Sequence, residues 1–267
     1  MILRELFGTE LPIVGSIALG PLPGSPRYGG ELGAVVDTAL EDARTLEAGG
    51  VDALSLENMG DAPFFASQVP AETVASFGRV LAELRRHTEL PIGVNVLRND
   101  GRAALAIALA FGGSFIRVNV LSEVYATDQG LIEGIGAELM RVRRLVGGER
   151  IAVFADVHVK HATPLVVRPI GESALDLVER GLADALVVSG PRTGSPPALQ
   201  DIVDARRAGP VVIGSGLTAD NAGTLLAAAD GAIVASTFRP RGDLSKRVEP
   251  DRVEGLMQVV RGLRADS

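Results

Sequence analysis

The stretch from residue 156 to 161, Asp-Val-His-Val-Lys-His, combines side chains that could carry out chemistry. A carboxylate, two imidazoles and an amine directly follow an apolar run typical of a buried strand. Because alternate strand side chains point to opposite faces, Asp156, His158 and Lys160 are expected on one face, and His161 on the other or in the next loop. Such a group could transfer protons, bind an anion or, together with Glu57, hold a divalent cation.

Lys160 and His158 each allow several interpretations. The ammonium group of Lys160 could bind a phosphate or carboxylate, form a Schiff base if desolvated, or only pair with Asp156 or Glu57. The imidazole of His158 could be a general acid or base, a metal ligand or a structural group. The sequence shows no complete set of metal ligands, so we predict neither a metal site nor a cofactor.

Polar side chains also follow other apolar runs of strand length. Glu57 is a carboxylate that could act as a base. Arg117 is expected on the same strand face as Asn119, where it could bind an anionic group or pair with Glu57. Neutral polar side chains could hydrogen-bond to a sugar or carbonyl oxygen. The predicted neutral binding residues are Asn58, Asn95, Asn119 and Ser189.

A glycine-rich turn, Gly214-Ser215-Gly216, lies between a predicted strand and a predicted helix. Backbone N–H groups in such a turn can bind a phosphate, and the residues after the last strand, including Ser236, would complete the site. The alternative is a tight turn that simply requires glycine.

These residues lie within a repeated pattern of an apolar strand, a turn and a helix. The predicted strands are 13–19, 51–56, 91–96, 115–120, 151–155, 185–188, 210–213 and 231–234. The predicted helices are 32–48, 72–87, 103–111, one ending at 146, 173–180, 197–208, 219–228 and 250–263. Eight such units predict a single (β/α)8 barrel, a TIM barrel, over residues 1–267, with its site at the C-terminal ends of the strands. A doubly wound sheet is the rival but more often has fewer strands.

Two further segments are predicted to lack regular structure. Residues 121–134 read as a long shaped loop that could act as a lid. Residues 239–249 are charged and contain glycine, so we expect a mobile loop after the last strand.

Composition narrows the functional classes. Of the 267 residues, 46% are hydrophobic, which is enough for a large core, and the net charge of −7 argues against nucleic-acid binding. The absence of cysteine excludes disulfides and thiolate chemistry. No stretch approaches the ~20 apolar residues of a membrane span, and no signal pattern begins the chain. We therefore expect a soluble cytoplasmic protein. The sequence does not determine its oligomeric state, and a homo-oligomer is possible.

Six ordered motifs resemble the BtpA family. That resemblance covers nearly the whole chain and implies a TIM-barrel fold. The best-known family member is a photosystem I biogenesis protein, whereas other members are uncharacterised. The motifs lie at residues 21–26, 57–61, 93–99, 115–119, 156–161 and 214–216.

The chain departs from the family pattern at two places. Family members usually carry a histidine where this chain has Ala18, so a role for that histidine does not carry over. They also carry a Gly-Thr pair and a nearby lysine where this chain has Ala235, Ser236 and Arg239. We expect the second change to alter the phosphate-binding end while Arg239 keeps its positive charge.

Together these features predict an enzyme that acts by acid/base chemistry on a small phosphorylated metabolite, a sugar phosphate or a nucleotide-like compound. Isomerisation, lyase chemistry and glycosidic-bond cleavage all fit. The alternative is a non-catalytic biogenesis or stability factor, as the family resemblance suggests. A scaffold would not need so many polar groups at strand ends, because burying them unpaired costs a few kcal/mol each. The predicted catalytic residues are Glu57, Asp156, His158 and Lys160.

Overall fold

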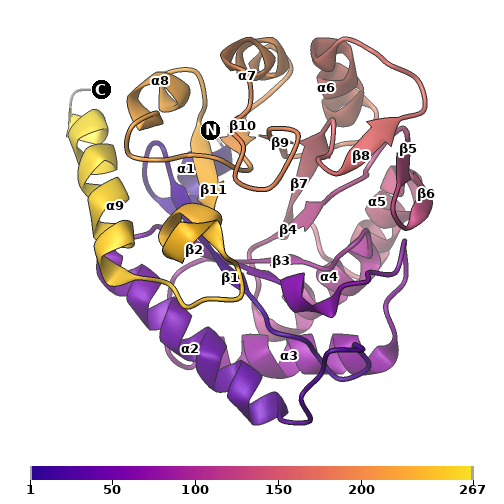
Figure 1. Ribbon diagram of the computed structural model, residues 1–267. Helices are drawn as coiled ribbons and strands as arrows, with labels where there is room; N and C mark the ends of the chain where they lie inside the picture. Colours follow the sequence, from indigo (N-terminus) through magenta and orange to yellow (C-terminus); the bar gives the residue numbers. More distant parts are fainter. Residues whose placement is uncertain (1, 266–267) are drawn as a thin grey trace.

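A closed barrel of eight parallel strands forms the centre of the computed structural model, which describes residues 2–265 (Figure 1). The strands are neighbours in the order β1-β11-β10-β9-β7-β4-β3-β2, so chain order follows the barrel wall. Their bounds are β1 Ile13–Ala18, β2 Ala53–Glu57, β3 Ile92–Asn95, β4 Phe115–Val118, β7 Ala152–Val157, β9 Ala185–Val188, β10 Val211–Ile213 and β11 Gly231–Val234. The predicted barrel is confirmed, and each predicted strand is present within a few residues.

Helices surround the barrel and bury one apolar side against it (Figure 1). In α2, for example, Val36, Ala39, Ala43 and Leu46 recur at helical spacing and are buried. This helix ends at Gly49 and is capped by Gly50, whose φ of 92° is left-handed. The surrounding helices are α2 Leu32–Gly49, α3 Ala71–Arg85, α4 Gly101–Phe111, α5 Gly136–Leu145, α6 Ile170–Glu179, α7 Leu199–Arg206, α8 Ala222–Leu226 and α9 Pro250–Ala265.

The barrel interior is apolar in its amino-terminal half. Two aromatic rings pack inside this half of the barrel: Phe115 and Phe154 stack with their centroids 4.7 Å apart. Gly93 makes room for Phe115, because a Cβ at this position would lie 2.1 Å from the ring. The polar strand-end residues therefore lie above a packed floor, toward the C-terminal mouth.

A short helix that the sequence did not predict, α1 (Ile2–Phe7), closes the amino-terminal end of the barrel. Leu3 and Phe7 are buried in the same cluster as the interior strand residues. The ring of Phe7 contacts Phe115 edge-on at a centroid distance of 5.7 Å.

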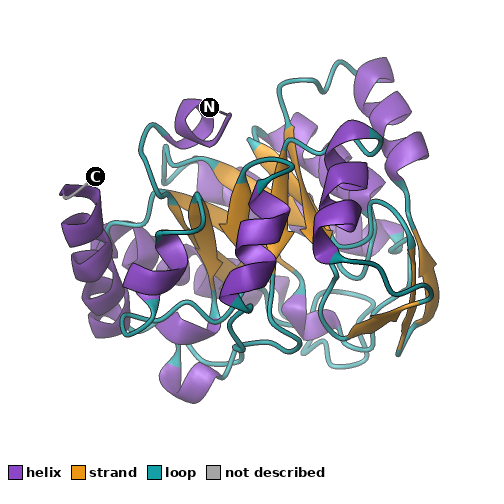
Figure 2. Ribbon diagram, turned by 90° about the horizontal axis from the view of Figure 1, so that it is seen from above, coloured by secondary structure: helices purple, strands orange, loops and turns teal. Residues whose placement is uncertain are grey.

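A three-stranded antiparallel sheet lies apart from the barrel wall, at the edge of the molecule (Figure 2). It consists of β5 (Val124–Thr127) between β6 (Gly130–Glu133) and β8 (Ala162–Pro164). The prediction of a loop over 121–134 was therefore wrong. The sheet forms because Tyr125 and Ile132 bury their side chains with Val159, a packing partner distant in sequence.

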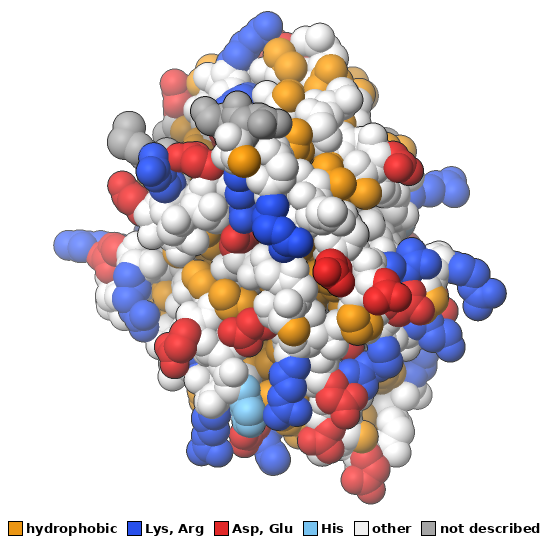
Figure 3. Space-filling view, turned by 90° about the vertical axis from the view of Figure 1, so that its left-hand side faces the viewer, with side chains coloured by type: hydrophobic (Ala, Val, Ile, Leu, Met, Phe, Trp, Pro, Cys, Tyr) orange, Lys and Arg blue, Asp and Glu red, His pale blue; other side chains and the backbone are white. Residues whose placement is uncertain are grey.

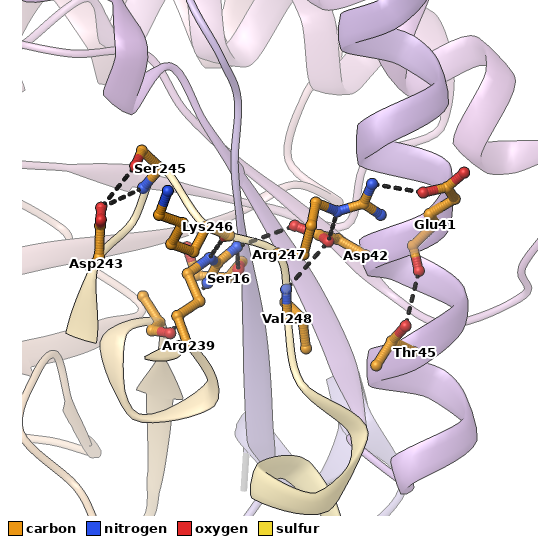
Figure 4. A network of polar contacts seen from close by, with 11 residues as sticks. Ser16, Glu41, Asp42, Thr45, Arg239, Asp243, Ser245, Lys246, Arg247 and Val248 are labelled. Atoms are coloured by element: carbon orange, nitrogen blue, oxygen red, sulfur yellow. Dashed lines mark hydrogen bonds and ion pairs between the residues drawn. The ribbon is translucent and has the colours of Figure 1, made fainter. Parts of the chain in front are cut away.

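The segment after β11 was predicted to be a mobile loop but is tied to β1 and α2 (Figure 4). It contains two short 3-10 turns, η2 (Ser236–Phe238) and η3 (Pro240–Gly242); a third, η1 (Met59–Asp61), follows β2. Fully buried Arg239 donates to the Ser16 carbonyl at 3.1 Å and to the Asp42 carboxylate at 3.3 Å. Arg247 donates to the same Asp42 at 2.8 Å. The expectation that Arg239 supplies charge to a phosphate was therefore wrong, because its guanidinium is used within this network.

Acidic and basic side chains are interspersed over the face that carries α2 and α9, with hydrophobic side chains scattered between them (Figure 3). The net charge is thus not gathered into one patch on this face. Within residues 2–265, no helix combines the length and apolarity needed to cross a membrane.

Candidate active site

A buried ion pair between Arg117 and Asp156 lies at the centre of the barrel mouth. Arg117 Nε donates to Asp156 Oδ1 at 2.8 Å, and Nη2 donates to Oδ2 at 3.1 Å. Asn119 Nδ2 adds a third hydrogen bond to this carboxylate, at 2.9 Å. Burial alone would lower the pKa of Arg117, but the carboxylates of Asp156 and Glu57 reverse this effect and raise it. Arg117 is therefore a permanent cation, and Asp156 fixes its position.

Glu57 is the less constrained of the two carboxylates. Its Oε1 lies 3.8 Å from Arg117 Nη1 and accepts a 3.3 Å hydrogen bond from the Ser55 hydroxyl. Its side chain is 9% exposed. Asn95 is its direct partner on the neighbouring strand β3, which places an amide beside this carboxylate. Of the predicted acids, Glu57 is therefore better placed than Asp156 to exchange a proton with a ligand.

Four buried polar atoms at or just below the mouth lack a hydrogen-bond partner among the described residues. Native structures contain few such atoms, since each loses hydration without compensation. Alternate side chains of β1 point into the barrel, so Ser16 faces inward like Val14, which packs in the same apolar cluster as Phe115 and Phe154. The unpaired atoms are Ser16 Oγ, Asn95 Oδ1, Asn119 Oδ1 and Ser189 Oγ. They are suited to bind a ligand that carries hydroxyl or amide groups.

Lys160 follows β7 and lies close enough to this cluster to respond to its charges. Burial lowers the pKa of Lys160 to about 8, with a further decrease from Arg117 that Glu57 and Asp156 oppose. Its backbone carbonyl accepts a hydrogen bond from Arg98, a buried side chain that the sequence analysis did not select as a site residue. When Lys160 is protonated, the mouth carries three cations and two carboxylates, so it favours an anionic ligand. The cations are Arg98, Arg117 and Lys160, and the carboxylates are Glu57 and Asp156.

The ring of His158 is hydrogen-bonded to α6 and not to Asp156, although His158 lines the same cavity as Lys160. Strand β7 ends at Val157, and His158 has a left-handed φ of 51°, which breaks the alternation. Its Nε2 lies 3.1 Å from the hydroxyl of Ser173 on α6, which donates to Glu123 at 2.7 Å. These contacts connect the end of β7 to α6 and the small sheet, so they support a structural role for His158.

His161 is exposed and lies outside the cluster. Its Nε2 is 3.0 Å from the Thr193 hydroxyl. Partial burial lowers the pKa of His161, and the neighbouring Lys160 lowers it further.

Asn58, a predicted binding residue, is used to hold two loops together. Its Oδ1 accepts from the Leu97 backbone amide at 2.8 Å, and its Nδ2 donates to Asp61 at 2.9 Å. Burial raises the pKa of Asp61 despite two hydrogen bonds that oppose this effect. The side chain of Asn58 is therefore less available to a ligand than that of Asn95.

The turn 214–216 packs under the loop that follows β9. The Ser215 hydroxyl donates to the Ser195 carbonyl at 2.9 Å. Gly216 has a φ of 74°, and a Cβ there would lie 2.2 Å from the Pro196 nitrogen. A Cβ on Gly214 would lie 2.4 Å from the Ser189 hydroxyl. The glycines thus allow close loop packing, as expected for a tight turn that requires glycine. Ser236 lies near the same loop, because its Oγ is 3.5 Å from the position that a Cβ on Gly194 would take.

Two of the cavities on the mouth side of the barrel are lined by charged residues discussed above. One, of about 800 Å³, includes Arg98, Asp128 and His161 in its lining. The other, of about 530 Å³, includes Lys160 and Ser189. A larger cavity of about 900 Å³ lies at the opposite end, between α1, α8 and α9, where the cluster described above contributes no side chain. Across residues 2–265, no group of three or more histidine, aspartate or glutamate side chains is arranged to hold a metal ion.

The fold defines the class of protein as a TIM barrel, and two solved structures share it. N-(5′-phosphoribosyl)anthranilate isomerase from Pyrococcus furiosus superposes with a TM-score of 0.58 at 14% identity, covering 94% of this chain and 99% of that one. Thiamine phosphate pyrophosphorylase from the same organism gives 0.58 at 16% identity, covering 98% of each chain. At these identities the likeness establishes the fold alone.

Sequence comparison identifies the family. The chain belongs to the BtpA family, whose model matches residues 9–262. It is 45% identical to the photosystem I biogenesis protein BtpA of Synechocystis, over 97% of this chain and 91% of that protein. The predicted family resemblance is thereby confirmed.

Proposed function

We propose that this protein is an enzyme that acts by acid/base chemistry on a small phosphorylated metabolite, either a sugar phosphate or a nucleotide-like compound. The observation that carries the proposal is the combination of buried charges and unpaired polar atoms in the mouth. Folding leaves Asn95 Oδ1, Asn119 Oδ1 and Ser189 Oγ without partners among residues 2–265, at a cost that a bound ligand would offset.

In this proposal, Glu57 transfers the proton and Arg117 and Lys160 balance the charge of the ligand. Asp156 holds Arg117 in place through the two hydrogen bonds described above. Asn95 Oδ1 and Asn119 Oδ1 accept hydrogen bonds from hydroxyl groups of the ligand, and the Ser189 hydroxyl donates to a hydroxyl or carbonyl oxygen. The excess positive charge in the mouth supports an anionic substrate, and both solved structures named above are of enzymes whose names include a phosphorylated compound.

The phosphate would lie at the ends of β10 and β11, near residues 214–216 and Ser236. Support comes from the position of these turns in the barrel, where phosphates bind in many proteins of this fold. The reaction would be an isomerisation, a lyase reaction or a glycosidic-bond cleavage.

Thermal unfolding with a panel of sugar phosphates and the matching unphosphorylated sugars tests this proposal. A ligand at 100 times its dissociation constant adds about 2.7 kcal/mol to stability, which raises Tm by several degrees. We expect a rise with at least one sugar phosphate and a smaller rise with its unphosphorylated sugar. No rise with any anion would contradict the proposal.

A second candidate function is a non-catalytic role in the biogenesis or stability of a larger complex. The 45% identity to a photosystem I biogenesis protein favours it. The same experiment separates the two candidates, because a scaffold has no reason to be stabilised selectively by a sugar phosphate.

A further inference from the structure

We propose that Lys160 forms an imine with the carbonyl group of its substrate, which would then be an anionic aldehyde or ketone. This inference rests on the proposed function and narrows its substrate class. It assigns to Lys160 a nucleophilic role in addition to charge balance.

The first argument is the choice of lysine itself. The chain contains 26 basic residues of the Lys and Arg types but only two lysines, Lys160 and Lys246, so 24 are arginines. Arginine serves nearly every surface and buried ion pair, including Arg117 in the same mouth. A guanidinium does not lose its proton in proteins and cannot form this imine, whereas an amine can. The position at the mouth thus carries one of the few side chains capable of this chemistry.

The second argument is the surroundings of the amine. The nearby carboxylate of Asp156 is occupied by Arg117 and Asn119, and Glu57 faces Arg117 and Ser55. Within residues 2–265, the ammonium of Lys160 therefore has neither an ion pair nor a hydrogen bond. Lys160 is partly buried and lines a cavity at the mouth, so a ligand can reach it.

The third argument is the availability of the neutral amine, which is the nucleophilic form. Because burial and Arg117 lower the pKa of Lys160 to about 8, a fraction of the order of one tenth is neutral at pH 7. Lys246, by contrast, is exposed on the segment that follows β11. It provides an internal reference for an ordinary surface lysine.

The reaction would proceed in two steps. The neutral amine bonds to the carbonyl carbon, and as the nitrogen loses a proton the oxygen gains one, giving a carbinolamine. That oxygen then takes up one more proton and leaves as water, so that a protonated imine remains. Glu57 is placed to relay the second proton from solvent. The positive imine withdraws electrons from the adjacent carbon, which assists the proton removal or carbon–carbon cleavage of an isomerase or lyase.

Reductive trapping tests this inference. The native protein is incubated with dihydroxyacetone phosphate, dihydroxyacetone or pyruvate in the presence of cyanoborohydride, and the modified lysines are located by peptide mass spectrometry. We expect an adduct on Lys160 at least about tenfold above that on Lys246 with one or more probes, with a rate that rises as pH increases through about 8. Equal modification of both lysines, or no adduct on Lys160 with any probe, would overturn the proposal.

Two conservative variants complete the design. Lys160→Arg keeps the positive charge but removes the amine, so the adduct should disappear, whereas Lys246→Arg should leave it unchanged. The comparison of two lysines within the native chain stands even if Lys160→Arg does not fold. Stabilisation by dihydroxyacetone phosphate without an adduct would leave the proposed function intact and refute only the imine. An adduct on Lys160 without selective stabilisation by phosphorylated ligands would support the imine and contradict the proposed function.

Discussion

Arg117 donates two hydrogen bonds to the carboxylate of Asp156, and the two side chains are only 2% and 1% exposed. They come from β4 and from the neighbouring barrel strand β7. Because Asp156 accepts from both Arg117 and Asn119, it holds together the side chains on which the mouth depends. Its main contribution is thus to position Arg117, while Glu57 remains available to the ligand.

Removing the charge of Asp156 should be strongly destabilising. In Asp156→Asn, the counter-charge that remains to the buried guanidinium of Arg117 within residues 2–265 is Glu57, 3.8 Å away. Breaking a buried pair from one side typically costs about 3–5 kcal/mol, so urea denaturation should show a loss of this size. Glu10→Gln removes a surface pair with Arg4 and serves as the control, with little expected change. Equal effects in the two variants would contradict the role assigned to Asp156.

Glu57→Gln should separate binding from turnover. The amide retains the shape of the side chain and can still hydrogen-bond, but it cannot transfer a proton. With a substrate found through the thermal panel, we expect kcat to fall by about 10²-fold or more with little change in ligand affinity. Glu133→Gln, at an exposed position of β6, should behave like the native protein. A Glu57→Gln enzyme with full kcat would remove Glu57 from the mechanism.

Lys160→Met should alter stability in a pH-dependent way. The folded-state pKa of about 8 lies below the ordinary value of 10.5, so the folded protein opposes protonation of Lys160. Native stability should therefore rise between pH 8 and 10.5, where the unfolded chain still binds the proton, and lie lowest below pH 8. The variant should be more stable than the native protein at pH 7, by on the order of 3 kcal/mol, and this difference should shrink toward pH 10.

Urea denaturation at several pH values measures this difference, and Lys246→Met is the matched control. A difference between Lys160→Met and the native protein that does not vary with pH would show that Lys160 has an ordinary environment.

Gly216→Ala should disturb the turn at which phosphate is proposed to bind. The added Cβ would meet the Pro196 nitrogen at 2.2 Å, and the φ of 74° is unfavourable for alanine. We expect the rise in Tm caused by phosphate or a sugar phosphate to be lost. Gly223→Ala, where nothing lies within 4 Å of the added carbon, should retain it. Retention of the full phosphate effect in Gly216→Ala would place the phosphate elsewhere.

Phe7→Ala tests the closure of the barrel floor by α1. The ring of Phe7 contacts both Phe115 and Phe154, at centroid distances of 5.7 and 6.2 Å. Its removal should cost about 3–5 kcal/mol in denaturation experiments. Leu145→Ala, with 84% of the residue exposed, should change stability little. An equally small effect of Phe7→Ala would mean that α1 does not support the barrel.

The barrel was predictable because strand and helix patterns alternate along the chain. The same pattern showed where each strand ends, and so which polar residues lie at the strand ends. Helix α1 was not, because six residues form less than two turns and depend on the contacts of Leu3 and Phe7 with distant strands. The small sheet likewise depends on tertiary packing around Tyr125.

Within the site, prediction succeeded where the backbone stays extended and failed where it turns. The suggested contact of Arg117 with Glu57 is present, whereas the hydrogen bonds of Arg117 and Asn119 to Asp156 were not predicted. His158 has a left-handed φ and contacts Ser173. Histidine adopts this φ more often than most residues, but the strand pattern alone does not predict it here. Ser16 could have been found, since it faces inward by the alternation of β1.

A crystal structure of the protein with a bound sugar phosphate from the thermal panel would test the central claim most directly. The account predicts the phosphate group at residues 214–216 and Ser236, with the rest of the molecule against Asn95, Asn119 and Ser189 and within reach of Glu57 and Lys160. A ligand found only in the cavity between α1, α8 and α9, or no ligand in the mouth at saturating concentration, would contradict it.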